Sequence, residues 1–427
     1  MEYQNSWEFA KSMDEKDPLK DFRNRFFIPQ HNGKDCIYFT GNSLGLQPKK
    51  TAQYVQQELD DWAGMGVEGH FRARNPWLPY HEIFPKQLSK IVGSKENEVV
   101  VMNSLTVNLH LLMVSFYRPS KQRNKIICEA KAFPSDQYAF ETQVKYHGYD
   151  PAETIIEVSP REREYGLRTE DIVSVIKEHG DSVAVVLFGG VNYYTGQFFD
   201  LKAITIAAHE VGAYAGFDLA HAAGNVELNL HDWGVDFACW CSYKYLNSGP
   251  GGVAGAYIHE KHAADTELPR FAGWWGYTKA TRFKMKKGFE AIPTAEGWQL
   301  SNAPILSMAA HKASLDIFDE AGMKRLVTKR KLLNDYLLFL VDHCNAAFGQ
   351  KIIEIITTRN EIERGCQLSM LMLKSGQEIF DELTRQGVIA DWREPNVIRV
   401  APVPLYNSFE DVYRFGEIVG TTINRFK

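Results

Sequence analysis

The chain has 427 residues, of which 44% are hydrophobic and 24% are charged, and its formal net charge is -5 at pH 7. This length suffices for a large domain with a substantial core and a smaller second domain. The weakly acidic balance argues against a nucleic-acid binder, and no apolar run approaches the roughly 20 residues that a membrane helix needs.

Six cysteines are scattered along the chain, and only Cys239 and Cys241 are close together. These two alternate within a strand-like run, so we predict reduced, buried thiols rather than a disulfide framework or a zinc site. The first residues lack the basic and apolar pattern of a signal peptide. We therefore expect a cytoplasmic protein.

The first part of the chain predicts a helix over 14–27 and a short strand over 35–40. Glycines then flank Ser43, which favours a loop whose backbone approaches a ligand, although an ordinary turn has the same pattern. An amphipathic helix over 49–62 leads into a glycine-rich, flexible stretch. His70 lies there, and on sequence alone it is more often a solvated residue than a catalytic one.

A buried strand over 98–103 is followed by Ser104, Leu105 and Thr106, which open a helix that runs to about residue 117. Ser104 and Thr106 can cap its first turn. Free N–H groups at a helix N-terminus bind anions. We place a phosphate there, with Leu105 and Thr106 as donors, and a simple capped helix is the alternative.

A second strand over 125–129 precedes Phe133-Pro134-Ser135-Asp136. The aromatic face of Phe133 could stack on a flat ring, whereas Asp136 could bond to ring substituents or cap the next helix. The next predicted elements are strands over 154–158 and 183–188 and helices over 169–179 and 204–211. This alternation predicts a mainly parallel sheet with right-handed crossovers.

The stretch 214–252 carries the strongest chemical pattern. Asp218 and His221 follow one apolar run, and Tyr243 and Lys244 follow the next. Parallel sheets place their chemistry at the C-terminal ends of strands. An amine and a carboxylate there suit pyridoxal phosphate (PLP), since the amine condenses with its aldehyde and the carboxylate pairs with its pyridine nitrogen. Taken alone, Lys244 is typical of a solvated loop residue and Asp218 is typical of a helix N-cap. The prediction of a PLP site therefore depends on these residues occurring together in one stretch.

Beyond residue 252 the sequence predicts a strand over 253–259 and polar-aromatic loops that contain Trp274 and Asn302. Core or interface packing is the alternative role for Trp274. Arg399 lies in an apolar strand, where an unpaired charge is costly, and its planar fork suits a carboxylate held bidentately. The other predicted elements are helices over 305–320, 329–344, 377–386 and from 408, and strands over 352–357 and 368–373.

The segments Gly216-Phe-Asp-Leu-Ala-His-Ala and Trp240-Cys-Ser-Tyr-Lys-Tyr-Leu-Asn resemble the kynureninase family of fold-type I PLP enzymes, in the aminotransferase class V group. The loop 41–46 and the segment 133–136 extend the resemblance, which covers nearly the whole chain. It implies an α/β fold: a large domain with a mainly parallel seven-stranded sheet and a smaller α+β C-terminal domain. By this resemblance, residues 1–60 form an N-terminal segment that packs on the small domain, 61–305 the PLP-binding domain and 306–427 the small domain.

The resemblance also assigns roles to residues. The catalytic residues would be Lys244, Tyr243 and Asp218, and the substrate would be bound by Ser43, His70, Asn302 and Arg399. The cofactor would be bound by Leu105, Thr106, Phe133, Pro134, Ser135, Asp136, Asp218, His221, Tyr243, Lys244, Trp274 and Asn302. Trp274 and Asn302 would come from the neighbouring subunit of a homodimer with shared active sites. No metal is implied, and neither is a nucleic-acid or membrane partner.

The implied reaction is PLP-dependent hydrolysis of L-kynurenine and 3-hydroxy-L-kynurenine to anthranilate or 3-hydroxyanthranilate plus L-alanine, in tryptophan catabolism and NAD biosynthesis. His70 and Asn302 match the animal-type pattern, which is associated with the 3-hydroxylated substrate. Gly189 stands where some relatives have Ser, so one side-chain contact to the cofactor could be absent.

Two alternatives come from other classes. A cysteine desulfurase or lyase of the same fold needs a reactive cysteine on a flexible loop, whereas Cys366 leads straight into a predicted strand. A non-catalytic member would bind a metabolite or a partner without chemistry. The presence of Lys244, Asp218 and Arg399 argues against this second alternative.

Overall fold

A computed structural model describes residues 2–425 of the chain. Its centre is a seven-stranded sheet in the order β4, β10, β9, β8, β7, β5, β6. β10 is antiparallel to β4 and β9, and the other neighbouring strands are parallel, which confirms the predicted fold class. The strands are β4 Val99–Val101, β5 Lys125–Glu129, β6 Ile155–Val158, β7 Val183–Gly189, β8 Tyr214–Asp218, β9 Phe237–Trp240 and β10 Gly255–Ile258.

Helices cover both faces of this sheet, because its strands are apolar on both sides. In β4, Val100 packs in a core with α5 and α6, whereas Val99 and Val101 pack in a second core with α4, α8, α9 and α11. These helices are α4 Pro85–Val92, α5 Leu105–Phe116, α6 Pro134–Tyr146, α8 Thr169–His179, α9 Leu201–Glu210 and α11 Ile305–Ala321.

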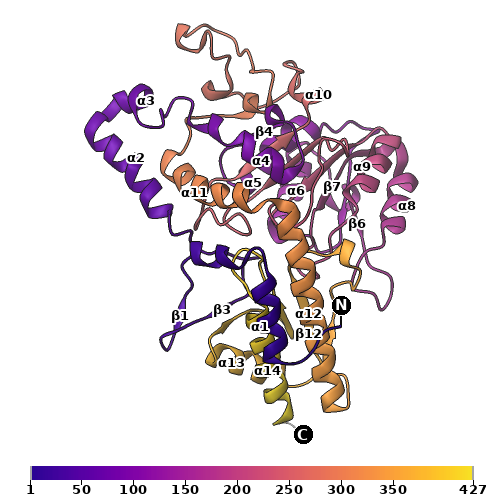
Figure 1. The fold of residues 1–427 in the computed structure, drawn as a ribbon. Coiled ribbons are helices and arrows are strands. Elements are labelled where there is room, and N and C mark those ends of the chain that lie inside the picture. The colour runs from indigo at the N-terminus through magenta and orange to yellow at the C-terminus, as the bar shows by residue number, and fades with distance from the viewer. Residues whose placement is uncertain (1, 426–427) are drawn as a thin grey trace.

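A second, smaller sheet forms the lower body in Figure 1 and has the order β11, β12, β15, β14, all antiparallel. A parallel pair of β3 and β13 lies beside it in the same core. The elements are β3 Ile37–Tyr38, β11 Ile353–Ile355, β12 Leu368–Met372, β13 Val388–Ile389, β14 Asp391–Arg393, β15 Val397–Val400, α12 Met323–Phe348, α13 Gly376–Arg385 and α14 Phe409–Asn424. Figure 1 shows α12 running down from the upper body into the lower one.

The N-terminal helix α1 (Trp7–Lys16) packs on this lower body. The carboxylate of Asp14 accepts the backbone N–H groups of Phe409 and Glu410, at 2.8 and 2.9 Å, and so binds the first turn of α14. The buried Lys329 Nζ lies 2.6 Å from the carboxylate of Asp17. The division of the chain at residues 60 and 305 stays a prediction, although these contacts agree with an N-terminal segment seated on the C-terminal part.

Some local predictions were wrong. The helix predicted over 14–27 ends at Lys16, because Pro18 disfavours helical backbone at the residue before it, and a 3-10 helix follows over Lys20–Arg25. The strand predicted over 35–40 splits into two short pairs. The remaining short elements are β1 Gln30–His31, β2 Lys34–Asp35, α7 Pro151–Thr154 and α10 Glu260–Ala263.

The glycine-rich stretch around His70 is helical rather than a loop. α2 (Thr51–Met65) continues through a 3-10 turn into α3 (Gly69–Arg72), which carries His70. Tyr54 and Val55 of α2 pack, partly buried, against the large core, but its fully buried residues are the acids Glu58 and Asp61. Their carboxylates accept hydrogen bonds from Asn75, Trp77 and Tyr80 and from Arg74.

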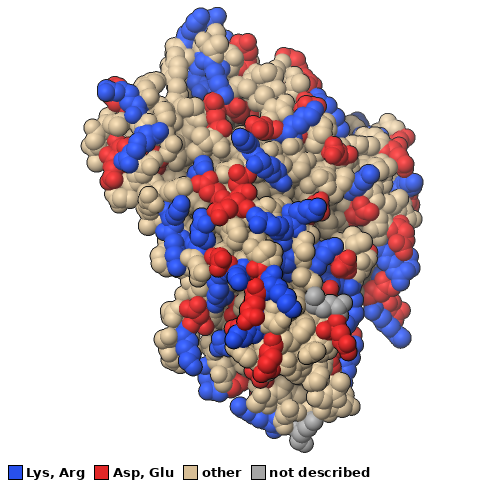
Figure 2. Space-filling model, in the orientation of Figure 1, with Lys and Arg blue, Asp and Glu red and all other residues tan. Residues whose placement is uncertain are grey.

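All six cysteines are free and buried, which confirms the prediction of buried thiols. Within residues 2–425, no helix is both long and apolar enough to cross a membrane. Basic and acidic side chains are interspersed on the face shown in Figure 2, in agreement with the small net charge.

Candidate active site

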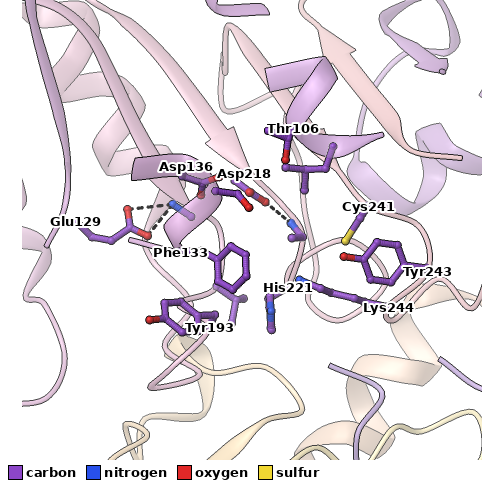
Figure 3. A pocket seen from close by; sticks show the side chains of 15 residues that line it. Thr106, Glu129, Phe133, Asp136, Tyr193, Asp218, His221, Cys241, Tyr243 and Lys244 are labelled. Carbon is purple, nitrogen blue, oxygen red and sulfur yellow. Dashed lines mark hydrogen bonds between the residues drawn. The ribbon is translucent and has the colours of Figure 1, made fainter. Parts of the chain in front are cut away.

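A pocket lies at the C-terminal ends of β5, β7, β8 and β9, where parallel strands meet at one edge of the sheet. It is lined by Leu105, Thr106, Glu129, Phe133, Ser135, Asp136, Gly189, Val191, Tyr193, Asp218, Ala220, His221, Cys241, Tyr243 and Lys244. Figure 3 shows that these side chains converge on one space from several segments. The structure thus brings together most of the residues that the sequence assigned to a cofactor.

Lys244 follows β9 and extends into the pocket beside two aromatic rings. Its Nζ lies 5.7 Å from the ring centroid of Phe133 and 6.0 Å from that of Tyr243. Phe133 packs edge-on against Tyr193, with centroids 5.2 Å apart, and is 40% exposed. One face of the Phe133 ring therefore remains available to stack on a bound ring, close to the lysine amine.

Asp218 and Asp136 are buried carboxylic acids on the other side of the pocket. Burial, and then the neighbouring carboxylates of Asp218 and Glu129, hold the pKa of Asp136 well above its usual range. Burial also raises the pKa of Asp218, against the opposing effects of the Ala220 N–H at 2.6 Å and of Lys244. A cationic group bound between these acids would favour their ionised forms, as a protonated pyridine nitrogen does.

Two buried polar atoms of the pocket, Asp136 Oδ1 and His221 Nδ1, have no hydrogen-bond partner within the described chain. Burial, and then the charge of Lys244, hold the pKa of His221 well below its usual range, so its imidazole is neutral. A neutral imidazole donates from one nitrogen and accepts at the other. A polar ring ligand would satisfy both atoms, which fits the substituted pyridine of PLP.

The N-terminus of α5, where the sequence predicts an anion site, lies at the pocket, but its capping differs from the prediction. Ser104 occupies the N-cap, but its side chain makes no capping hydrogen bond to residues in the described range. The prediction that Ser104 caps this helix was therefore wrong. Leu105 and Thr106 of the first turn line the pocket, so the binding of a phosphate at this helix N-terminus stays a prediction that their position supports.

The loop that contains Ser43 supports Lys244 from behind. The Gly45 N–H donates to the carbonyl oxygen of Tyr243 at 2.8 Å. A Cβ atom on Gly45 would collide with the Lys244 carbonyl oxygen and with Asn247 Oδ1. Ser43 itself is exposed and does not line the pocket, so its role in substrate binding stays a prediction.

Arg399 lies next to the pocket wall and is paired, as its burial requires. Its guanidinium donates to the carbonyl oxygen of Tyr193 and to the carboxylate of Asp391, while its Nε has no partner among residues 2–425. Arg399 is 1% exposed and does not itself line the pocket. Tyr193, whose carbonyl oxygen accepts the hydrogen bond from Arg399, does line the pocket.

Besides Ser43 and Arg399, four predicted residues lie outside the pocket of this chain. Trp274 is 39% exposed, and its Nε1 donates to Asn302 Oδ1 at 3.3 Å. His70 Nδ1 lies 3.0 Å from the Val67 carbonyl oxygen, on the projecting α3. Pro134 opens α6, directly after Phe133 at the N-cap, so Asp136 is not the cap of this helix. None of these four lines the pocket.

Glu129 is a pocket residue that the sequence analysis did not single out. Both carboxylate oxygens lie 3.1 Å from the Gly189 nitrogen, and its pKa is raised by burial to about 7. A Cβ atom on Gly189 would lie 2.9 Å from Glu129 Oε1. Glu129 is the last residue of an apolar strand, which is the same pattern that identified Asp218. Tyr193, Val191 and Cys241 were also missed, and no local pattern distinguishes them.

Two family models match the chain: Aminotransferase class-V over residues 37–348, and Kynureninase C-terminal domain over residues 326–419. A kynureninase of Flavobacterium psychrophilum is 58% identical over 419 residues, which cover 98% of each chain. A human kynureninase is 49% identical over 431 residues, which cover 97% of this chain and 92% of the human one.

Solved structures of lower identity share the fold. A C-DES mutant with glycine covalently linked to its PLP cofactor matches with a TM-score of 0.75 at 15% identity, covering 90% of this chain and 96% of that one. A cysteine desulfurase from Thermococcus onnurineus matches with a TM-score of 0.73 at 16% identity, covering 97% and 98%. At such identity the likeness shows the fold alone.

Replacement of Gly45 by Ala tests the support behind Lys244. We expect Gly45→Ala to lower the melting temperature and to cost about 1–3 kcal/mol, because the added methyl group meets backbone and a buried amide. Gly64→Ala is the matched control, since a Cβ atom there meets nothing within 4 Å; within α2 it should stabilise by up to about 1 kcal/mol. Equal melting temperatures for the two variants would contradict this packing.

Replacement of Glu129 by Gln tests the burial of its charge. The pKa of Glu129 is about 7 in the folded chain, above the value of roughly 4.3 expected when unfolded. Its contribution to stability is therefore present at low pH and lost as the pH rises to about 7. We expect Glu129→Gln to gain stability relative to the wild type between pH 5 and pH 8, on the order of 2–3 kcal/mol. Urea unfolding at pH 5 and pH 8 measures the difference in unfolding free energy between the variant and the wild type. Glu153→Gln, at an exposed position, is the control. A difference for Glu129→Gln that does not change with pH would contradict this prediction.

Proposed function

This chain belongs to the kynureninase family, and we propose that Lys244, Asp218 and Arg399 carry out the reaction of that family in it. The chain is a PLP-dependent hydrolase that converts L-kynurenine into anthranilate and L-alanine, a reaction of tryptophan catabolism and NAD biosynthesis. One observation carries the assignment of residues: the Lys244 amine, the Asp218 carboxylate and the Phe133 ring share one pocket at the sheet edge.

The charges of the pocket suit the two ends of PLP. The N-terminus of α5, with Leu105 and Thr106, would bind the phosphate. Asp218 and Asp136 would pair with the pyridine nitrogen and a ring substituent, and Phe133 would stack on the ring. Bound PLP supplies an aldehyde that condenses with amines and a ring that accepts the electron pair left at the substrate's α-carbon.

Lys244 and Tyr243 would move protons. The Lys244 amine, once displaced by the substrate amine, would remove the α-proton and return it further along the reaction. Burial, and then the thiol of Cys241, raise the pKa of Tyr243, so its phenol stays protonated at neutral pH. A protonated phenol beside the lysine suits a proton donor when the carbon–carbon bond breaks, and it can also donate to the phosphate.

Arg399 would hold the substrate's α-carboxylate. Its Nε–H group has no partner within residues 2–425, whereas its two terminal nitrogens contact Tyr193 and Asp391. The substrate would therefore have to displace or share the Asp391 contact. We also propose that 3-hydroxy-L-kynurenine is accepted and preferred, with Asn302 facing the ring hydroxyl, since an amide both donates and accepts.

A homodimer would bring Trp274, Asn302 and His70 to a pocket. Exposed apolar side chains gather on the projecting α2–α3 segment, where Trp62 is 61%, Val67 73% and Phe71 60% exposed. A patch of this kind is typical of an interaction surface. A second copy is the occupant we propose, because these residues flank His70, which has no role in the pocket of its own chain.

The desulfurase alternative finds no support in the cysteines. Cys366 is 1% exposed, and burial raises its pKa to about 12, which opposes formation of a reactive thiolate. The six buried, free thiols agree with the proposed cytoplasmic location, because disulfides are rare in that compartment.

The direct test is to incubate the PLP-loaded protein with L-kynurenine and 3-hydroxy-L-kynurenine while following aromatic product and alanine. We expect Lys244→Ala to lose at least about 10³-fold in rate because it removes the proton-transferring amine. The exposed Lys202→Ala on α9 should keep full activity. Equal kcat/KM for the two substrates would refute the preference for the hydroxylated one, and a wild type without product would refute the residue assignment.

Shared sites can be tested by complementation. Lys244→Ala and Trp274→Ala chains, inactive or weak alone, are co-expressed with different tags. Random pairing gives half heterodimers with one intact site of two, so recovery should reach about a quarter of wild-type activity. Lys244→Ala with Asp218→Ala is the matched control: both residues line the same pocket of one chain, so no intact site can form. Equal recovery in both mixtures, or none in either, would contradict a site shared in this way.

A further inference from the structure

A cluster of two histidines and one glutamate lies at the edge of the large sheet opposite the cofactor pocket. Glu98 immediately precedes β4, His231 lies in the connection before β9, and His259 directly follows the antiparallel β10. All three positions belong to the N-terminal edge of the parallel strands, whereas Lys244 follows the other end of β9. The reaction described above uses none of these three residues.

The three side chains present their ligand atoms to one another. Glu98 Oε1 lies 2.8 Å from His231 Nδ1 and 3.7 Å from His259 Nδ1, and all three atoms lie within 4.8 Å of one another. The two imidazole rings stack with centroids 4.9 Å apart and an interplanar angle of 23°, which aligns both rings beside the carboxylate. The backbone N–H groups of His231 and His259 donate to the carbonyl oxygens of Gly93 and Asp236, so both positions are fixed.

The charge of Glu98 is the second observation. Its side chain is 0% exposed, and its only ion-pair partners within residues 2–425 are these two imidazoles. Nearby acids differ: Asp236 has the Lys261 ammonium at 2.8 Å, and Glu260 has that of Lys95. Backbone hydrogen bonds to both oxygens of Glu98 offset part of the cost of burying this carboxylate, and a bound cation would offset more of it.

A comparable cluster elsewhere is already filled. His81, Glu82 and Glu296 also offer three ligand atoms, but Lys279 Nζ lies 2.8 Å from both carboxylates and supplies the positive charge. That ammonium occupies the place that a metal ion would take. The Glu98 cluster has no such side chain among the described residues.

We propose that Glu98, His231 and His259 form a binding site for one divalent transition-metal ion, with Zn²⁺ as the best fit. Two imidazole nitrogens, one carboxylate oxygen and a water complete the tetrahedral set that Zn²⁺ prefers. Bond lengths near 2.1 Å place such ligand atoms roughly 3.4 Å apart, so shifts below about 1.5 Å suffice.

Binding requires small rearrangements at both histidines. His231 Nδ1 lies in hydrogen-bond contact with Glu98 Oε1 at 2.8 Å and would exchange this contact for the metal. His259 Nδ1 accepts the Lys261 N–H at 3.2 Å and would exchange this hydrogen bond for the metal. Glu98 Oε1 also accepts the Glu260 N–H at 2.8 Å, and Oε2 accepts the Lys95 N–H at 2.8 Å; both bonds can remain and orient the carboxylate. The ion would join three segments distant in the sequence, so it would act on stability rather than on the cofactor pocket.

The test uses PLP-loaded protein, freed of metal by a chelator and then titrated with ZnCl₂ by calorimetry. We expect one equivalent to bind, the melting temperature to rise, and kynurenine turnover to stay unchanged. His231→Gln and His259→Asn should each weaken binding by more than about tenfold, since even loss of an outer partner of a metal ligand costs that much. The exposed His343→Gln on α12 is the control and should bind as the wild type does.

Cobalt(II) in place of zinc gives an independent signal, because tetrahedral nitrogen and oxygen ligands produce visible absorption bands. These bands should appear in the wild type and in His343→Gln and be absent from His231→Gln. Since His231 is partly exposed, its variant is expected to fold even if a Glu98 variant does not. No zinc bound at stoichiometric concentration, or equal binding by all variants, would overturn the site and leave the proposed hydrolase activity untouched.

Discussion

The electrostatics of the pocket depend on three buried carboxyl groups that lie opposite a single lysine. Glu129, Asp136 and Asp218 line it, and Lys244 is the one Lys or Arg side chain among the lining residues of the described chain. Buried carboxylates are costly unless a positive charge lies beside them. The N-terminus of α5 lies at the same pocket, and a helix N-terminus favours negative charge. This polarity would orient a ligand that carries a phosphate at one end and a cationic nitrogen at the other.

The large sheet separates two kinds of chemistry because its strands end in polar residues at both edges. The C-terminal ends of β5, β8 and β9 lead to the cofactor pocket. The opposite edge carries Glu98, Asp236 and the histidines around them. Between their ends, β7, β8 and β9 are apolar and buried, so the two groups of charges lie on opposite sides of an apolar core. Changes at one edge are therefore expected to leave the other intact.

The sequence predicted elements whose pattern is local. β7, β8 and β9 are continuous apolar runs that end in polar residues, and their ends contain Asp218 and lead to Lys244. The sequence predicted α2 as a helix over 49–62, whereas α3 escaped prediction because the glycines before it suggested a flexible loop. The second half of α2 is held by the buried Glu58 and Asp61, whose partners lie between residues 74 and 80. No periodicity in α2 shows that these two acids face inward together with Tyr54 and Val55.

The role of Gly189 is understood only together with Glu129, which lies beside it. Some relatives have Ser at this position, so the sequence alone suggests that Gly189 lacks one side-chain contact to the cofactor. In the structure the space beside it is taken by the Glu129 carboxylate, which accepts the Gly189 N–H through both oxygens. A Ser would bring its Cβ to 2.9 Å from Glu129 Oε1, so a glycine is what allows the glutamate to approach. Glu129 therefore acts together with Gly189: its carboxylate holds the backbone at the end of β7 and also supplies a polar side chain where Gly189 has none.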